Sequence, residues 1–436
     1  MDRLTLGFAS VALFGLLATS TGCDATQADP LRVREAATAA PAPPTNDWPA
    51  FRGPNRNGIS SEKDWLSTWP ADGPKKLWTA QVGLGYSSVA VADGRAYTLG
   101  NKDGNETVYC LDAVTGRALW RYSYPCDLVA NLHVGGPGAT PTVDGERVYT
   151  VSKQGQLHCF ATKPAGEGPE KVNEPLWTIN LPSQLSVPQP EWGFTSSPLV
   201  FKELLVLDAG GLVAFDKTTG KQVWRSTQYR AGYGSPVRYD APTGETYIVA
   251  ITNDAFVVVD PATGAEIAKY PWESQYVTAS TTPVVSGRTF FLSTGYGGGC
   301  ALVELVGDKL NQLYRNEEMS NHMCTSVLRD GKLYGIHGNS HTARQCKLVC
   351  LDLSTGKRVW EQRGFGCGAL TMAADKLLIQ ADDGYLVIAE ASPEGYKELA
   401  RTRAFEGPTW TMPVLCRGRI YCRSEAGEVV CLDVKK

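Results

Sequence analysis

The sequence has no strong excess of either charge. Its 436 residues include 42 Lys and Arg against 45 Asp and Glu, which gives a formal net charge of -3. A protein that binds nucleic acid usually carries a basic surplus on one face, so this balance argues against nucleic acid as a partner. Only 20% of the residues are charged, whereas 45 are Gly, 11 are Trp and 18 are Tyr. That composition suits many short strands and turns.

Catalytic sequence motifs are also missing. The chain contains no Ser in a nucleophile-elbow pattern, no phosphate-binding Gly loop and no HExxH motif. Each of these patterns supplies a nucleophile, a phosphate cradle or a pair of metal ligands at fixed spacing. Hydrolase and kinase chemistry therefore have no support in the sequence.

The apolar run near the start is short. Leu4 to Ala18 is long enough for the hydrophobic region of a secretion signal but too short to span a membrane comfortably. We therefore expect residues 1–23 to be an export signal. The stretch Leu16 to Cys23 resembles a bacterial lipoprotein signal, in which Cys23 becomes the lipidated first residue; an ordinary cleaved signal is the alternative.

Two further segments precede the main body. Residues 24–46 are rich in Ala, Thr and Pro without periodicity, so they cannot bury enough apolar surface to fold and read as a disordered tether. Residues 47–76 carry Trp48 and Phe51, which are poor choices for a solvated linker. We expect this second segment to be an ordered extension packed on the main body, with an exposed binding motif as the alternative.

A ten-residue motif recurs through the rest of the chain. Leu351 to Trp360 is repeated as Leu111 to Trp120 and as Phe215 to Trp224. Each copy reads as a strand end, a turn closed by an Asp and a Gly, and a second strand bearing a Trp that must be buried outside its own hairpin. The repeat positions are Asp112, Gly116, Trp120, Asp216, Gly220, Trp224, Asp352, Gly356 and Trp360.

With the paired strands that precede each copy, the repeat predicts an all-β fold, an eight-bladed β-propeller of four-stranded antiparallel blades over residues 77–436. Because two of the repeat units are degenerate, a ring of seven blades stays an alternative. The last unit stops at Asp433 without an outer strand, whereas Lys76 to Val82 is an orphan strand bearing Trp78. We therefore expect the N-terminal strand to complete the last blade and close the ring.

These turns and Trp residues resemble the pyrroloquinoline-quinone-type (PQQ-type) propeller repeat, which occurs in quinoprotein dehydrogenases and in the BamB lipoproteins of outer-membrane assembly. The resemblance covers roughly Leu77 to the C-terminus. It implies the fold, whereas function has to be argued from a site.

In a propeller we expect that site at the mouth of the central channel, where the segments leading into the innermost strands converge. The aromatic residues of these segments are Tyr86, Trp192, Phe194, Tyr233, Tyr276, His322 and Trp410. They are candidates for a rim that binds a flat ligand or a peptide. The alternative is that these rings only plug the channel.

Membership among the quinoprotein dehydrogenases would imply carboxylates for Ca²⁺, a carboxylate base and cations for the acidic cofactor. None of the segments that lead into the innermost strands contains Asp, Glu, Lys or Arg; the nearest are Asp127, Glu191, Arg230 and Glu273. No two Cys are adjacent, unlike the paired cysteines of many quinoprotein alcohol dehydrogenases. We therefore predict no cofactor and no catalytic residue, and keep a PQQ- and Ca²⁺-dependent dehydrogenase as the alternative.

Histidine and cysteine give weaker candidates. His337, His341, Cys346 and Cys350 share one expected hairpin, but Cys350 occupies a strand position that Cys also takes in other units, so no metal site is predicted. Disulfides between Cys422 and Cys431 or between Cys324 and Cys367 are conceivable.

The favoured interpretation is a monomeric, non-catalytic propeller, exported to the periplasm or held at a membrane through Cys23, that serves as a scaffold for envelope proteins. Its expected contact surfaces are the loop from Pro125 to Gly138, the insertion from Leu181 to Glu191 and the hairpin from Gly335 to Gln345.

Overall fold

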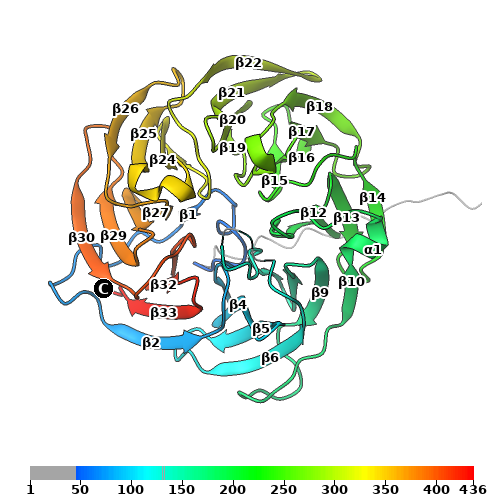
Figure 1. The fold of residues 1–436 in the computed structure, drawn as a ribbon, viewed down its shortest axis with the longest axis vertical. Helices are drawn as coiled ribbons and strands as arrows, with labels where there is room; N and C mark the ends of the chain where they lie inside the picture. The colour runs from blue at the N-terminus through cyan, green and yellow to red at the C-terminus, as the bar shows by residue number, and fades with distance from the viewer. Residues whose placement is uncertain (1–45, 130, 132) are drawn as a thin grey trace, which may run out of the picture. The chain divides into compact units, whose positions relative to one another are not determined.

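The computed structural model describes residues 46–436 apart from residues 130 and 132. The expected export signal, Cys23 and nearly all of the tether lie outside the described residues. Within them the chain forms eight sheets set around a central axis (Figure 1). The predicted all-β, eight-bladed propeller is confirmed, and the alternative of seven blades is wrong.

Each blade contributes four antiparallel strands, which follow in sequence order from the axis outward in blades 1 to 7, whereas the outer strand of blade 8 precedes blade 1 in the chain. Blades 1 and 2 contain β3 (Ala90–Ala92), β4 (Arg95–Lys102), β5 (Asn105–Asp112), β6 (Ala118–Pro125), β7 (Thr142–Asp144), β8 (Arg147–Val151), β9 (Gln156–Ala161) and β10 (Trp177–Asn180). Blades 3 and 4 contain β11 (Leu199–Phe201), β12 (Leu204–Asp208), β13 (Leu212–Asp216), β14 (Gln222–Arg225), β15 (Val237–Asp240), β16 (Thr246–Ile251), β17 (Ala255–Val259) and β18 (Glu266–Pro271).

Blades 5 and 6 contain β19 (Val284–Ser286), β20 (Thr289–Thr294), β21 (Gly299–Val306), β22 (Lys309–Asn316), β23 (Val327–Arg329), β24 (Lys332–His337), β25 (Lys347–Asp352) and β26 (Arg358–Gln362). Blades 7 and 8 contain β27 (Ala369–Ala373), β28 (Lys376–Gln380), β29 (Tyr385–Glu390), β30 (Glu398–Arg403), β31 (Val414–Cys416), β32 (Arg419–Arg423), β33 (Glu428–Asp433) and β2 (Lys76–Gln81). The short elements are β1 (Ile59–Ser60), α1 (Leu181–Leu185) and two 3₁₀ turns, Gln275–Val277 and Ser340–Gln345. No helix of the described part is long and apolar enough to cross a membrane.

The ring closes where its two ends meet. Strand β2 pairs antiparallel with β33, with Trp78 opposite Cys431 and Thr79 opposite Val430. This pairing supplies the outer strand that the last repeat lacks, as predicted. Blade 8 therefore has the four antiparallel strands of the other blades, and β2 forms its outer edge.

The repeated turn is stabilised by its Asp. In blade 3 the Asp216 carboxylate accepts hydrogen bonds from the backbone N–H of Thr218 (3.1 Å) and Thr219 (2.7 Å), and Gly220 adopts a positive φ of 72°. The same two bonds form around Asp112 and Asp260, whereas Asp352 accepts from the backbone N–H of Thr355 and from the Ser354 hydroxyl. Each Asp therefore satisfies backbone donors that the tight turn would otherwise leave unpaired.

The Trp of one blade lies against the turn of the next. The Trp224 ring covers Gly264 so closely that a Cβ on this glycine would lie 2.5 Å from it, and the Trp224 indole donates to Pro261 O at 2.9 Å. The pair Trp78 and Gly116 repeats this arrangement. The motif therefore joins neighbouring blades, which is why it recurs along the chain.

The segment that precedes β2 lies against the innermost strands. Its backbone forms an isolated β-bridge between Trp48 and Val91 of β3. The carbonyl oxygen of Pro49 accepts a hydrogen bond from the backbone N–H of Val143 in β7. Strand β1 then runs parallel to β27 as a fifth strand of blade 7. In Figure 1 this segment is the blue trace that reaches the centre of the ring.

Candidate functional site

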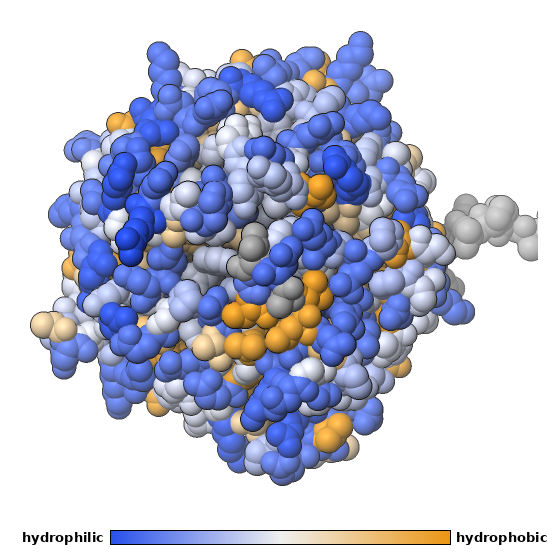
Figure 2. Space-filling model, in the orientation of Figure 1, coloured by the Kyte–Doolittle hydropathy of each residue, from blue (hydrophilic) through white to orange (hydrophobic). Residues whose placement is uncertain are grey.

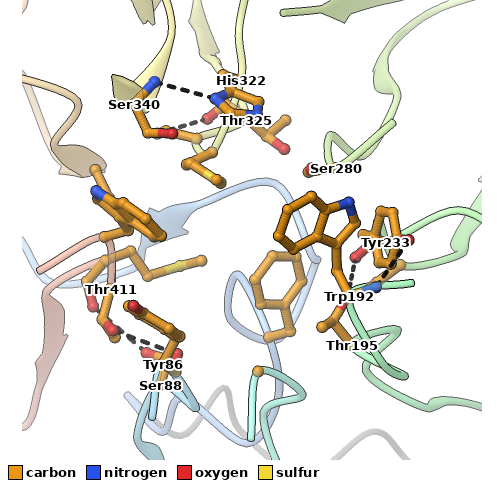
Figure 3. A pocket seen from close by; sticks show the side chains of 18 of the residues that line it. Tyr86, Ser88, Trp192, Thr195, Tyr233, Ser280, His322, Thr325, Ser340 and Thr411 are labelled. Carbon is orange, nitrogen blue, oxygen red and sulfur yellow. Dashed lines mark hydrogen bonds between the residues drawn. The ribbon is translucent and has the colours of Figure 1, made fainter. Parts of the chain in front are cut away.

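A cavity of about 270 Å³ lies on the propeller axis, and residues from several blades line it (Figure 3). The space-filling view shows a hollow near the centre of this face with an apolar patch at its edge (Figure 2). We call this cavity the axial cup. Its walls come from loops that connect blades and from loops between the second and third strands of individual blades.

One wall of the cup is a group of aromatic rings at the seam. Tyr86 stacks on Trp410 with ring centroids 5.0 Å apart and planes at 11°. The His133 ring lies 5.7 Å from Tyr86 and 5.3 Å from Trp192, measured between centroids. These rings present flat apolar faces to the cavity, which favours ligands that are themselves flat.

A second aromatic group comes from blades 5 and 6. Tyr296 lies between His322, at 4.8 Å, and His341, at 5.3 Å and nearly parallel. His322 accepts a hydrogen bond from Ser340 N at 3.1 Å, and burial lowers the pKa of His322 to about 4. Figure 3 shows His322 and Trp192 entering the cavity from different sides. At neutral pH this second wall carries no charge on His322.

Phe51 and Arg52 of the N-terminal segment also line the cup. The Arg52 guanidinium is 2% exposed and donates to Thr325 O at 2.9 Å and Ser326 O at 2.8 Å, at the start of blade 6. Arg56 reaches Ser197 O and Pro236 O on blades 3 and 4 in the same way. The bonds of these arginines to several blades hold the segment inside the ring.

Lys153 is the most unusual polar residue of the cup. It lies between β8 and β9, is 2% exposed and lines the cavity. Its ammonium group forms neither an ion pair nor a hydrogen bond with any residue that the structure describes, although its backbone N–H donates to Glu106 at 3.2 Å. Burial lowers the pKa of Lys153 to about 8, so the group is still mostly charged at pH 7.

Glu106 stands behind this wall and does not line the cup. Its carboxyl group accepts a hydrogen bond from the Tyr124 hydroxyl at 2.7 Å in addition to that from Lys153 N. Burial raises the pKa of Glu106 to about 7. The acid is therefore only partly ionised near neutrality and is already hydrogen-bonded.

Five of the seven aromatic residues predicted for the rim line the cup: Tyr86, Trp192, Tyr233, His322 and Trp410. Phe194 does not; it is 3% exposed and packs in the core between blades 2 and 3, against Gly155. Tyr276 does not either; it is 63% exposed and touches only the edge of the site through Tyr296. Whether the five bind a ligand stays a prediction.

Several lining residues were not predicted for the rim, among them Lys153 and Tyr296, whereas His341 was expected only as a weak metal-ligand candidate in the contact hairpin Gly335 to Gln345. They belong to loops between the second and third strands of their blades. Those loops open on the same face as the segments that lead into the innermost strands. Only the latter segments were considered for the aromatic rim when the site was predicted from the sequence. Alternation of strand direction within each predicted blade could have identified them.

The histidines and cysteines of the hairpin do not converge on one point in the described structure. His337 accepts from Ser320 N at 3.0 Å, His341 stacks on Tyr296, and Cys350 is buried in the blade core. No group of three or more His, Cys, Asp or Glu suited to a metal occurs in the described residues. The four side chains face different surroundings because they lie on different parts of the hairpin.

Neither conceivable disulfide is formed. Cys422 pairs with Val430 and Cys431 with Tyr421, which places the two thiols on opposite faces of blade 8. Cys324 and Cys367 are both free and buried. Cys367 lies close to Cys346, whose pKa is lowered by the Cys367 thiol and whose Sγ donates to Asn339 O at 3.3 Å.

Comparison with known proteins agrees with the fold. A family model described as outer membrane protein assembly factor BamB matches residues 70–166 and 104–362, together more than half of the chain. The chain belongs to this BamB family. The resemblance to PQQ-type propeller proteins is thereby confirmed.

Two curated proteins are similar in sequence. BamB of Burkholderia pseudomallei is 26% identical over 277 residues, which cover 54% of this chain and 70% of that protein. Tetrathionate hydrolase of Acidithiobacillus ferrooxidans is 26% identical over 200 residues, which cover 43% of this chain and only 37% of the hydrolase. Among solved structures, a europium-containing methanol dehydrogenase superposes with a TM-score of 0.65 at 12% identity, covering 86% of this chain and 89% of the dehydrogenase. At that identity the likeness shows the fold alone.

The dehydrogenase structure raises the question of whether this BamB-family chain could hold a quinone and its metal. Ca²⁺ takes six to eight oxygen ligands, most of them carboxylates. Among the described residues that line the cup there is no Asp or Glu. Lys153 and Arg52 could face an acidic cofactor, but the donor set that a calcium-bound quinone requires is not there.

Proposed function

We propose that this protein is a non-catalytic propeller of the cell envelope that recognises a protein partner through its axial cup. The observation that carries the proposal is the character of the cup: its lining combines stacked aromatic rings and buried cations with no carboxylate. Redox catalysis on this fold needs a base and metal ligands, whereas recognition needs shape and a few placed polar groups.

Membership of the BamB family supports the envelope assignment. The short apolar run and Cys23 fit an exported chain that is lipidated at this cysteine. Metabolic labelling with a palmitate analogue tests this directly. Wild-type protein should carry the label and Cys23→Ser should not; equal labelling of both, or of neither, would contradict lipidation.

Partner recognition is tested by co-purification from the membrane fraction with matched variants. Trp410→Ala removes one of the stacked rings of the cup, whereas Leu313→Ala changes an exposed residue on outer strand β22, far from the axis. The wild type and Leu313→Ala should retain the same partner, and Trp410→Ala should lose it while its thermal unfolding remains cooperative. Loss with Leu313→Ala, or retention with Trp410→Ala, would contradict recognition through the cup.

A further inference from the structure

Three buried side chains of the cup region carry positive charge without a carboxylate partner. Lys153 has no partner for its ammonium group among the described residues, and Arg52 donates only to backbone carbonyls. Arg423, behind Tyr86, likewise donates to Ser87 O at 2.7 Å and Gly83 O at 3.1 Å. A buried cation is normally paired with an anion, because its desolvation is otherwise uncompensated.

The position of Lys153 indicates where such an anion would lie. Its side chain runs beside Gly193, where a Cβ would meet Lys153 Cδ at 2.8 Å and Cε at 2.9 Å. Burial is the main cause of the lowered pKa of His133, and the charge of Lys153 is the second cause. The ammonium group therefore lies near the His133 ring. The charge therefore lies on the side of the cavity formed by Trp192 and His133, opposite no carboxylate among the described lining residues.

Glu106 is the acid that acts on this charge: it raises the pKa of Lys153, but burial lowers that pKa by more, and no ion pair joins the two groups in the described structure. Glu106 is occupied by the Tyr124 hydroxyl and by Lys153 N. Glu425 accepts the Tyr86 hydroxyl at 2.8 Å and is not a lining residue. An anion that enters the cup therefore meets an ammonium group and aromatic faces with no competing carboxylate.

We propose that the axial cup binds a carboxylate carried on a flat aromatic body, with the carboxylate at Lys153 and the aromatic body between the rings of the two walls. A cavity of about 270 Å³ suits a single bicyclic side chain rather than a folded element. Such a group can come from a free aromatic acid or from a partner chain whose last residue is aromatic. The inference rests on the proposed recognition function and names the chemistry that the cup selects.

Calorimetric titration of the full-length protein tests the inference with blocked amino acids. N-acetyl-L-tryptophan carries the carboxylate, and N-acetyl-L-tryptophan amide is the matched neutral probe. The acid should bind at least tenfold more tightly than the amide. Equal affinities would overturn the inference, and this comparison needs no variant.

Substitutions then locate the charge. Lys153→Met should weaken binding of the acid at least tenfold and leave binding of the amide unchanged, with Lys153→Gln as a second variant if the first does not fold. Lys309→Met, on exposed strand β22, is the control and should change neither affinity. Undiminished binding of the acid to folded Lys153 variants would overturn the assignment.

Peptides separate the two sources. One probe is a hexapeptide that ends in tryptophan with a free carboxylate. If the natural ligand is a chain end, this peptide should bind more tightly than N-acetyl-L-tryptophan. If the natural ligand is a free acid, it should bind no more tightly, and either result fits the shared chemistry. Preference for the amidated peptide would contradict it. Failure of all these probes leaves recognition through the cup standing, whereas Ca²⁺-dependent dye reduction with added PQQ would overturn the proposed function itself.

Discussion

Tyr86 of blade 1 stacks on Trp410 of the loop that leads into blade 8, across the seam where the two ends of the chain meet. Thr411 donates to Tyr86 O at 3.3 Å and the Tyr86 hydroxyl donates to Glu425. The wall of the cup is thus built by the same neighbours that close the ring. The recognition that we propose for the cup would therefore use residues that lie beside the point of ring closure.

This stack should be measurable as an energetic coupling. A double-mutant cycle with Tyr86→Ala and Trp410→Ala should give a coupling free energy of about 1 kcal/mol in the free energy of unfolding, the usual value for an aromatic pair. Urea denaturation of the four proteins measures it. Strictly additive effects would show that the stack contributes nothing.

Arg52 should be important for stability. Arg52→Met removes the donors to Thr325 O and Ser326 O and leaves buried carbonyls without partners, so the free energy of unfolding should fall by about 3 kcal/mol. Arg363→Met, at an exposed position, should change it by less than about 0.5 kcal/mol. Similar stabilities for the two variants in urea denaturation would contradict a structural role for the N-terminal segment.

The contact between a Trp and the next turn predicts a difference between two glycines. Gly264→Ala forces a Cβ to 2.5 Å from Trp224 at a φ of 74°. Gly307→Ala has a φ of 63° but no atom within 4 Å, so it suffers only the backbone strain of about 1 kcal/mol. Thermal melts should rank Gly264→Ala clearly below Gly307→Ala; equal melting temperatures would argue against the interblade contact.

Glu106 predicts a pH-dependent difference in stability. Because burial raises the pKa of Glu106 in the folded protein to about 7 from its ordinary value of 4.5, its contribution is most favourable below pH 4.5 and is lost as the pH rises to about 7. Relative to wild type, Glu106→Gln should therefore gain stability across this window, by at most about 1.4 kcal/mol per pH unit.

Comparison of the two proteins is necessary because other groups titrate there. Burial lowers the pKa of His133, His158 and His322 to about 4, so these side chains favour folding above pH 6.5 and act in the opposite direction. They are common to both proteins and cancel in the difference. Urea denaturation at several pH values gives the slope, and a difference that falls between pH 4.5 and 7 would contradict the raised pKa.

Cys346 and Cys367 are the pair expected to crosslink under oxidising conditions. The Cys367 thiol lowers the pKa of Cys346, and the Cys346 thiol raises the pKa of Cys367, so the two side chains lie close together. Refolding in a glutathione redox buffer would remove two protons and two electrons to form one disulfide between blade 6 and blade 7. Peptide mapping should find Cys346 joined to Cys367; a Cys324–Cys367 crosslink would contradict this.

The repeat made the fold predictable, because the Asp, Gly and Trp of each copy act locally in a turn and at the next blade. Closure by the strand that carries Trp78 followed from an unfinished last unit. The cup was less accessible to sequence reasoning. Lys153 and Tyr296 come from loops whose face depends on strand direction, and the path of Arg52 into the ring depends on contacts with residues almost three hundred positions away.

The placement of Phe194 shows a second limit. It lies one residue from Gly193 and two from Trp192, yet the chain turns it into the core between blades 2 and 3. Aromatic residues near the channel mouth divide between wall and core according to the local backbone, which a pattern of residue types does not encode.

The most direct measurement is the thermal unfolding and dye-linked alcohol oxidation of the purified full-length protein supplied with PQQ, with Ca²⁺ or with a chelator. Because no carboxylate lines the cup, the melting temperature with PQQ should be the same with Ca²⁺ and with chelator, and no dye should be reduced. A stabilisation that requires Ca²⁺, accompanied by dye reduction, would contradict a non-catalytic propeller.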